Sequence, residues 1–303
     1  MPLHQRLTQN NDTGFRFSPP PGLTAYPYLG SGGYSIVFRA HAEKDGVAHA
    51  VAVKLPLDLT KSQMGLEHAV LTDMAKLCVV DMGLMSFVAL SAAMEANRVL
   101  AEEVDTSTSV DSAVLYLQHV PRMLALTARF CVLTPCGTPL IQHMQAGVAA
   151  TERRAFARTV TLHVLHALVA AHSAGWAHCD VRPSNIIWHE GRAVLIDWGL
   201  ASRLHVQQRG WSGVYEFVAD ALLQARGKTT RYTSNMDLWA AVYTYVTLAY
   251  GRAGRAPWAK DIEPFCTATD DFDMTKRRAQ QLDGFAEGDV FLATLCAYLR
   301  GAA

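Results

Sequence analysis

The sequence predicts an α+β fold in two lobes, a small N-terminal lobe built on an antiparallel sheet and a larger, mainly helical C-terminal lobe. Residues 23–55 alternate aromatic and β-branched side chains with glycine turns, which is typical of three successive antiparallel strands. Beyond Thr151 the apolar residues follow a helical period over most of the chain. Strands that come first and helices that come later favour two segregated parts over an alternating α/β sheet.

The sequence also indicates where the N-terminal lobe begins and ends. The lead ends in Pro19-Pro20-Pro21-Gly22 and lacks the basic start and apolar middle of a secretory signal. After Lys61 the pattern becomes helical, and two short strands are expected near 123–126 and 129–134. Pro135-Cys136-Gly137 is the expected hinge. The expected parts are a flexible lead at 1–22, an N-terminal lobe at 23–134 with a helical insertion at about 78–109, and a C-terminal lobe at 135–303.

Two helices are expected to organise the C-terminal lobe. The first begins at Thr151, where a side-chain oxygen can satisfy a free N–H group, and Glu152 opposes the helix dipole. The second, from Asp237 to Tyr250, is apolar nearly all round, as expected of a helix at the centre of a lobe. The apolar face of the first helix comprises Phe156, Val160, Val164 and Leu168.

Composition excludes several classes of partner. Lysine plus arginine and aspartate plus glutamate are equal at 27 each, so we expect no nucleic-acid and no membrane partner. The apolar stretch 79–100 is interrupted by residues such as Asp81 and Glu95, which makes it a packed helix rather than a membrane span. The six scattered cysteines indicate free thiols in a reducing compartment. We therefore expect a cytoplasmic monomer, and a nuclear location is also compatible.

A glycine cluster and a strand lysine together predict a phosphate-binding site. Gly30-Ser31-Gly32-Gly33-Tyr34-Ser35-Ile36-Val37 lies between two predicted strands, where missing β-carbons let backbone N–H groups close over polyphosphate. Alone, such a cluster is more often an ordinary hairpin turn. Ala52-Val53-Lys54 follows, with the lysine 17 residues after Val37. An ammonium group buried in an apolar strand needs an anionic partner, which phosphate oxygens and a helix carboxylate would supply.

Two glutamates compete for contact with Lys54. Glu67 lies 13 residues later in a helical segment and is the first choice. Glu95, in Met94-Glu95-Ala96-Asn97, is the alternative. Taken singly, each glutamate could simply be a solvent-exposed charge on a helix. Only the requirement that Lys54 has one anionic partner favours a functional interpretation of either residue.

The segment from His178 to Trp188 carries the strongest chemical signal. Asp180 is followed five residues later by Asn185, and a proline stiffens the loop between them. Asp197 comes twelve residues after Asn185, at the end of a second apolar strand, so a hairpin would place the two side by side as oxygen ligands for Mg²⁺. Asp180 would then accept or orient the proton of an attacking hydroxyl. The alternative is that all three cap turns, and their joint spacing after a glycine loop and a strand lysine argues against it.

These motifs resemble the eukaryotic protein-kinase catalytic domain from about Leu29 to Trp258. Leu195-Ile196-Asp197-Trp198-Gly199 is similar to the metal-binding motif of casein kinase 2, and Val132 to Gly137 resembles the adenine-binding hinge, with Leu133 gating the rear pocket. The resemblance implies ATP and Mg²⁺ as cofactors and a protein or peptide substrate. It implies catalytic roles for Asp180, Lys54, Arg182 and Glu67, nucleotide contacts at Gly30, Ser31, Gly32, Gly33, Val37, Ala52, Lys54, Thr134 and Cys136, and metal ligation by Asn185 and Asp197.

Several positions depart from the family pattern. Cys179 replaces the usual arginine before the catalytic aspartate, so a phosphorylated loop would lack its main cationic partner. Arg182 stands where serine/threonine kinases usually have lysine, and it can still neutralise a γ-phosphate. In the run Gly213 to Ala221, which resembles the substrate-docking loop, Val214 replaces threonine and Asp220-Ala221 replaces Pro-Glu. The family's glutamate–arginine tie beneath this loop is therefore expected to be absent on one side, that of the glutamate.

Three functions remain open. The favoured one is transfer of the ATP γ-phosphate to serine or threonine hydroxyls of a protein, because every residue that the chemistry needs is present. An inactive kinase-like scaffold is motivated by the changes at Cys179, Val214 and Asp220. Small-molecule phosphotransfer, as in aminoglycoside or choline kinases, shares the aspartate-to-asparagine spacing. Gly199 and the long segment 200–219 resemble protein kinases more closely.

Overall fold

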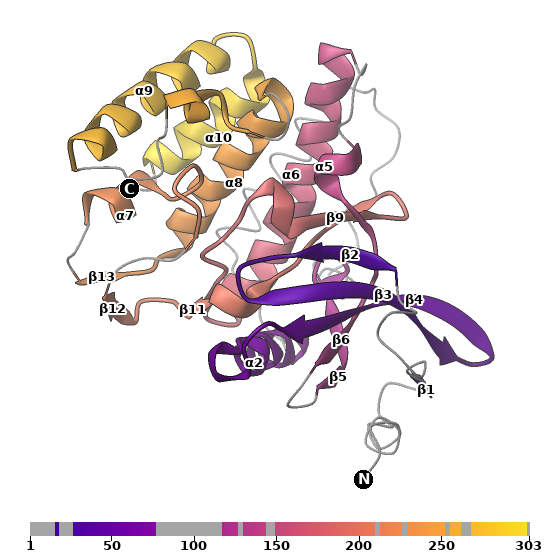
Figure 1. Ribbon diagram of the computed structural model, residues 1–303. Coiled ribbons are helices and arrows are strands. Elements are labelled where there is room, and N and C mark those ends of the chain that lie inside the picture. Colours follow the sequence, from indigo (N-terminus) through magenta and orange to yellow (C-terminus); the bar gives the residue numbers. More distant parts are fainter. Residues whose placement is uncertain are drawn as a thin grey trace.

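The structure is a computed structural model that describes residues 16–17, 27–76, 117–126, 130–143, 149–209, 213–225, 229–251, 255–261 and 268–301. Figure 1 shows a sheet lobe beside a helical lobe, so the predicted fold class is confirmed. The insertion predicted at about 78–109 lies outside the described residues. Of the predicted lead, the structure describes Arg16 and Phe17, which form a short strand against residues 42–43.

The small lobe is built on a six-stranded antiparallel sheet. Its long hairpin turns at Asp45 and Gly46, both at positive φ, which suits the right-handed twist of the flanking strands. Lys54 lies inside the sheet, because Val37 pairs with it on one side and Cys131 on the other. The strands are β1 (Arg16–Phe17), β2 (Tyr28–Ser31), β3 (Ser35–Lys44), β4 (Val47–Pro56), β5 (Arg122–Leu126) and β6 (Cys131–Thr134), in the order β1-β3-β4-β6-β5 with β2 paired to β3.

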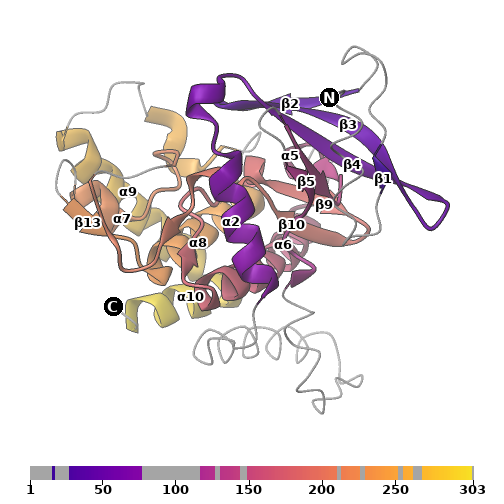
Figure 2. The same cartoon turned by 90° about the horizontal axis from the view of Figure 1, so that it is seen from below.

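Helix α2 (Met64–Ala75) lies between the small-lobe sheet and the helical lobe, as Figure 2 shows. A short 3₁₀ turn, η3 (Leu59–Lys61), leads from β4 towards it. The buried face of α2 comprises Met64, Glu67, Val70, Leu71 and Met74, so a carboxylate shares an otherwise apolar face. A fully buried carboxylate is costly without a partner, which makes Glu67 the informative residue on this helix.

Two long helices form the centre of the helical lobe. In α8 (Ser234–Tyr250) almost every residue from Asp237 onward is buried, as predicted, although the helix begins three residues earlier. The cap predicted at Thr151 is wrong: α6 (Ala150–Ser173) begins after Ala149 without a side-chain cap, and Thr151 already lies in the first turn. The other helices in the described residues are α5 (Leu140–His143), α7 (Asp220–Gln224), α9 (Ala268–Ala286) and α10 (Val290–Gly301), with η6 at Pro257–Asp261.

Short strands at the lobe boundary position the polar loops. Strands β9 (Ile186–His189) and β10 (Arg192–Leu195) form the predicted hairpin, and β7 (Thr138–Pro139) extends it. The turns η4 (Pro183–Asn185) and η5 (Trp198–Leu200) flank this hairpin at one end. The remaining pairs are β8 (Trp176–Ala177) with β11 (Ser202–Arg203), and β12 (Gln207–Arg209) with β13 (Thr229–Arg231).

Within the part of the chain that the structure describes, no helix has both the length and the apolar character needed to cross a bilayer.

Candidate active site

Lys54 joins the two lobes through a pair of carboxylates. Its Nζ lies 2.9 Å from Glu67 Oε2 on α2 and 2.6 Å from Asp197 Oδ1 in the helical lobe. The other oxygen of Glu67 accepts a hydrogen bond from the backbone N–H of Trp198 at 3.2 Å. Glu67 is fully buried, and the two donors, Lys54 Nζ and the Trp198 N–H, satisfy one carboxylate oxygen each. The contact predicted between Lys54 and Glu67 is therefore present, and Glu95 lies outside the described residues.

The charges of this trio stabilise one another. Burial alone would lower the pKa of Lys54, but Glu67 and Asp197 outweigh it and raise the pKa above its ordinary value. Burial would likewise raise the pKa of Asp197, and Lys54 outweighs it so that the pKa is lowered. Lys54 is thus a cation and Asp197 an anion at neutral pH. Asp197 itself adopts a left-handed conformation, with φ 66° and ψ 64°, which turns its side chain at the end of the hairpin.

A buried aspartate on α8 holds the loop that carries Asp180. Asp237 accepts hydrogen bonds from the backbone N–H groups of His178 at 2.7 Å and Cys179 at 3.0 Å, and from His172 Nε2 at 3.0 Å. Burial would raise the pKa of Asp237, but these hydrogen bonds, with His172 first, lower it. His178 uses both ring nitrogens, because Nδ1 accepts from the Asp180 N–H and Nε2 donates to the Ile196 carbonyl. The loop is thereby fastened to the segment that carries Asp197.

The two oxygens of Asp180 have different surroundings. Oδ2 accepts hydrogen bonds from Asn185 Nδ2 at 2.7 Å and from Arg182 Nε at 3.0 Å. Oδ1 is buried and has no hydrogen-bond partner among the described residues. Val214, at the position where the family usually has threonine, supplies no hydroxyl there. A buried carboxylate oxygen without a donor is unfavourable, so Oδ1 is the atom ready to accept a proton or a hydrogen bond from a ligand.

Asn185 and Asp197 fit a divalent cation that brings further oxygen ligands with it. The Nδ2 group of Asn185 is used by the carbonyl and carboxylate of Asp180, which leaves its amide oxygen for a cation. The backbone N–H of Ile196 donates to the Asn185 carbonyl at 2.8 Å and so brings Asp197 beside it. In the described ranges no cluster of three or more His, Cys, Asp or Glu side chains suits a metal. Two hard oxygens plus phosphate oxygens are the coordination that Mg²⁺ accepts.

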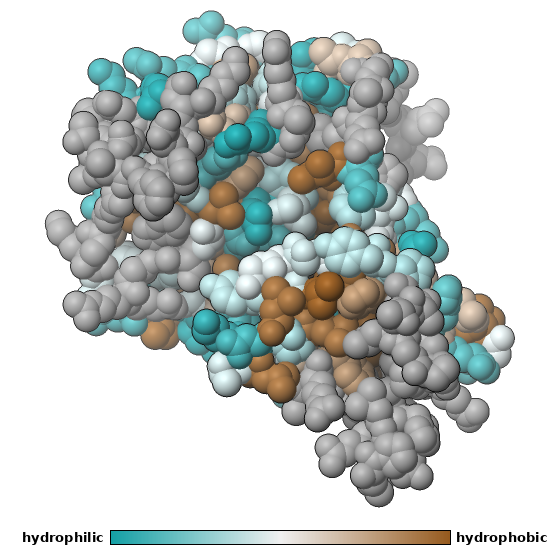
Figure 3. Space-filling view, viewed as in Figure 1, coloured by the Kyte–Doolittle hydropathy of each residue, from teal (hydrophilic) through white to brown (hydrophobic). Residues whose placement is uncertain are grey.

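A cleft of about 380 Å³ opens between the lobes at this point. In Figure 3 a pale strip at the level of β2 crosses this face, and brown, hydrophobic side chains show on both sides of it. A hollow that combines apolar walls with a few convergent polar groups is the usual form of a small-molecule site. The predicted residues that line the cleft are Gly30, Ser31, Gly32, Val37, Ala52, Lys54, Glu67, Cys136, Arg182, Asn185 and Asp197.

Some predictions about the cleft differ from the structure. Thr134 is not among the lining residues, whereas its neighbours Leu133 and Pro135 are. Gly33 lines an adjoining hollow together with Asp180. The sequence analysis did not predict a set of apolar and small residues that line the cleft. Some of them lie next to or near Asn185 and Asp197 in the sequence, which could have indicated their position. They are Leu29, Ser35, Pro121, Pro139, Ser184, Ile187 and Ile196.

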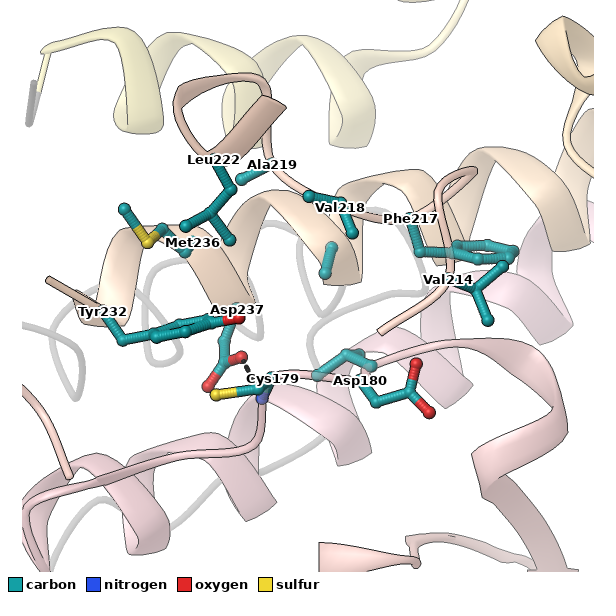
Figure 4. Close-up of a pocket in the computed structure, with 12 residues that line it drawn as sticks. Cys179, Asp180, Val214, Phe217, Val218, Ala219, Leu222, Tyr232, Met236 and Asp237 are labelled. Carbon is teal, nitrogen blue, oxygen red and sulfur yellow. Dashed lines mark hydrogen bonds between the residues drawn. The ribbon is translucent and has the colours of Figure 1, made fainter. Parts of the chain in front are cut away.

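The loop from Gly213 to Ala221 packs on the apolar surroundings of Cys179. Figure 4 shows Cys179 facing Leu222, Tyr232 and Met236, while the carboxylate of Asp180 points away from them. The cavity among these side chains is about 20 Å³, which is room for about one water molecule. Burial raises the pKa of the Cys179 thiol, so it stays protonated. The position that holds arginine in the family pattern is here part of an apolar core.

Asp220 takes the place of the absent glutamate in a carboxylate–arginine tie. Arg278 on α9 is fully buried, and its Nη1 donates to Asp220 Oδ1 at 2.9 Å and to the Val218 carbonyl at 2.7 Å. Its guanidinium lies 4.1 Å from the centre of the Tyr243 ring. Asp220, one position before the usual glutamate, supplies the carboxylate because the loop end turns it towards α9. The docking loop is therefore fastened to the helical lobe at its end.

Comparison with known proteins agrees with this geometry. A family model described as "Protein kinase domain" matches residues 23–282. A sheet lobe and a helical lobe that bring a lysine–glutamate pair and an aspartate-asparagine loop to one cleft define a kinase-type phosphotransferase fold. The chain belongs to the protein kinase domain family.

Individual relatives match over part of the chain. Mitogen-activated protein kinase kinase kinase 8 of Rattus norvegicus is 30% identical over 105 residues, 33% of this chain and 21% of that protein. Serine/threonine-protein kinase pakE of Dictyostelium discoideum is 30% identical over 130 residues, 42% of this chain and 14% of that protein. The matches thus span about a fifth or less of these two relatives. A solved structure titled "Structure of vaccinia related kinase 3" has a TM-score of 0.54 and 15% identity, covering 87% of this chain and 71% of the other.

Proposed function

We propose that this protein kinase transfers the γ-phosphate of ATP to serine or threonine hydroxyls of a protein substrate, with Mg²⁺ bound at Asn185 and Asp197. One observation carries the proposal. The Lys54–Glu67–Asp197 trio and Asn185 line one cleft, and Asp180, which has one oxygen without a partner, lines the adjoining hollow together with Lys54 and Asp197. A carboxylate positioned to accept a proton, with the cations Lys54 and Arg182 nearby, is the arrangement that phosphoryl transfer requires.

The roles of the side chains follow from their contacts. Lys54, held by Glu67, presents its remaining N–H donor to phosphate oxygens, and Arg182 lies beside Asp180 where it can neutralise a γ-phosphate. Asn185 fixes Oδ2 of Asp180, which leaves Oδ1 to accept the proton of the attacking hydroxyl. ATP supplies the phosphoryl group and Mg²⁺ neutralises its charge. The glycine segment Gly30 to Gly33 would cover the phosphates with backbone N–H groups.

Nucleotide binding is tested by thermal unfolding. ATP with Mg²⁺ at 100 times its Kd should stabilise the folded chain by about 2.7 kcal/mol, since a ligand that binds only the folded state raises the melting temperature. ATP with EDTA should give a much smaller shift, and Asp197→Asn should remove the difference between the two. A melting temperature that is the same with and without ATP and Mg²⁺ would favour the inactive scaffold instead.

Phosphotransfer is tested with labelled ATP and peptide libraries that contain serine and threonine, or tyrosine, as the only hydroxyl residue. Asp180→Asn should lower the rate on the order of 10² to 10⁴-fold, because an amide cannot accept the hydroxyl proton. The matched control is Asp283→Asn, an exposed aspartate on α9 far from the cleft. Equal labelling by wild type and Asp180→Asn would contradict the assignment of Asp180, and labelling confined to tyrosine would contradict the serine/threonine assignment.

A further inference from the structure

The last turn of α2 carries an aspartate that requires partners from outside the helix. Asp73 lies near the C-terminal end of α2, where the helix dipole disfavours a negative charge, and no basic residue lies in that turn. Both of its donors come from the helical lobe. Trp176 Nε1 lies 3.1 Å and Arg203 Nη2 lies 2.8 Å from the same oxygen, Asp73 Oδ2. The hydrogen bond from Trp176, followed by the charges of Arg203 and of Lys76 just after the helix, lowers the pKa of Asp73, so the carboxylate stays ionised at neutral pH.

Trp176 and Arg203 are held next to each other by contacts that do not involve Asp73. They stand directly opposite each other in the antiparallel pair β8–β11. The Arg203 guanidinium lies 3.9 Å from the centre of the Trp176 ring, and its Nη1 donates to the Ala174 carbonyl at 3.3 Å. A planar cation held flat on an indole ring keeps its N–H edge in a fixed direction. That edge and the indole N–H meet at the Asp73 carboxylate.

Asp73 and Glu67 attach the same helix at two points. They are six residues apart, which is about 9 Å along the axis of an α-helix. Glu67 fixes one point through Lys54 and the Trp198 backbone, and Asp73 fixes the other through Trp176 and Arg203. One attachment alone would let α2 pivot over its apolar contacts, since dispersion contacts have little directionality. Two attachments define both its position and its rotation.

We propose that Asp73, Trp176 and Arg203 form a latch that holds α2 in the position where Glu67 meets Lys54, and that they are positioning residues for phosphotransfer. The latch uses a cation of the chain itself, so it needs no phosphate on the segment that follows Asp197. This fits the apolar setting of Cys179, which offers no cationic partner to such a phosphate. The activity part of the proposal rests on the proposed function.

The test compares Asp73→Asn, Arg203→Gln and the double variant with wild type. Asparagine keeps the shape of Asp73 and can still accept from Trp176, so it removes mainly the charge. Each single change should lower kcat about three- to fivefold, the range for a partly exposed ion pair, and change the KM for ATP less than about twofold. The double variant should be no worse than the poorer single variant, because both changes remove one shared interaction. Asp73→Glu and Arg203→Lys should retain more activity than their neutral counterparts.

The position of α2 is read independently by hydrogen exchange. Amides from Glu67 to Ala75 should exchange about threefold faster in Asp73→Asn, and the control Asp283→Asn, which breaks the exposed pair with Arg300, should leave them unchanged. Additive effects of the two single changes on kcat, or α2 exchange equal to wild type, would overturn the latch. If the wild type transfers no phosphate at all, the proposed function fails, and α2 exchange still decides whether the latch exists.

Discussion

The carboxylate of Asp180 depends on the backbone of Gly213, a residue that is distant in sequence and adjacent in space. Gly213 has a φ of 107°, which side chains other than hydrogen rarely allow. A β-carbon there would lie 2.7 Å from the Cys179 carbonyl oxygen and 3.4 Å from Asp180 Oδ1. The clash is with backbone, which cannot rotate away. Glycine at this position therefore lets the loop from Gly213 to Ala221 approach the Asp180 carboxylate closely.

We expect Gly213→Ala to lower both stability and activity. The strained φ and the contact with Cys179 should cost about 1–3 kcal/mol of unfolding free energy, and displacement of the loop should reduce kcat at least about tenfold. Urea unfolding and steady-state kinetics measure the two effects. Gly284→Ala is the matched control, because a β-carbon at Gly284 in α9 meets nothing within 4 Å. A Gly213→Ala enzyme with normal kcat would show that the loop does not position Asp180.

At the scale of elements, α9 fastens the docking loop through a single buried arginine. Arg278 donates to the carbonyls of Val218 and, at 3.4 Å, Tyr215, as well as to Asp220. Its guanidinium also contacts the rings of Tyr243 and Trp258, 4.1 Å and 5.4 Å from their centres. A fully buried cation with this many directed contacts ties the loop, α8 and α9 into one unit.

We expect Arg278→Lys to lower the free energy of unfolding by about 2–4 kcal/mol. An ammonium group cannot reproduce the planar fork or the stacking, so a buried charge would lose part of its compensation. Asp220→Asn should cost about 1 kcal/mol or less, because Asp220 is 34% exposed. Arg255→Lys, in an exposed pair with Glu216, is the control and should change little. Equal effects of Arg278→Lys and Arg255→Lys in urea unfolding would contradict this account.

The elements and the chemical core could be predicted because their signals are local. The spacing from Asp180 to Asn185 and Asp197 is fixed by a tight loop and a hairpin, so residue type and distance suffice. The Asp220–Arg278 tie could not be predicted, because the carboxylate moved by one position and only the fold shows that it still reaches α9. The contacts of Asp73 could not be predicted either, because its partners Trp176 and Arg203 are far away in sequence. Apolar cleft residues such as Ile187 and Ile196 resemble any strand residue.

At the scale of the whole molecule, three neighbouring histidines join the two lobes. His119 follows the undescribed stretch and leads into β5, and its ring centre lies 4.2 Å from that of His163 on α6. His166, one turn later on α6, lies 5.2 Å from His119. His119 Nδ1 bonds to the Ala193 carbonyl, and His163 Nδ1 accepts from the Ala193 N–H, which requires a neutral ring. Burial lowers the pKa of His163 to about 3 and of His166 to about 4, with the other rings and Arg192 adding to the shift of His163.

Acid should therefore destabilise the protein in a defined range. These folded-state pKa values lie below the ordinary value of 6.5, so the stabilisation is complete above pH 6.5 and is lost as the pH falls towards 3. The loss from His163 at pH 5 should be on the order of 2 kcal/mol. His163→Asn, which keeps an acceptor for Ala193, should flatten the dependence of unfolding free energy on pH, whereas His205→Asn at an exposed turn should not. Parallel pH profiles for wild type and His163→Asn would rule out this origin.

Lys54 contacts carboxylates in both lobes, and the net charge of these groups should affect how the lobes respond to ions and nucleotides. Three carboxylates, Glu67, Asp180 and Asp197, pair with two cations, Lys54 and Arg182, so this group of side chains carries one net negative charge. A polyphosphate that enters alone adds repulsion and competes with Asp197 for the same ammonium group. A polyphosphate that enters with a bound divalent cation offers Asp197 that cation in place of Lys54. Nucleotide without a divalent cation should therefore weaken the contact between the two lobes. The concentration of divalent cations should then determine whether the lobes close.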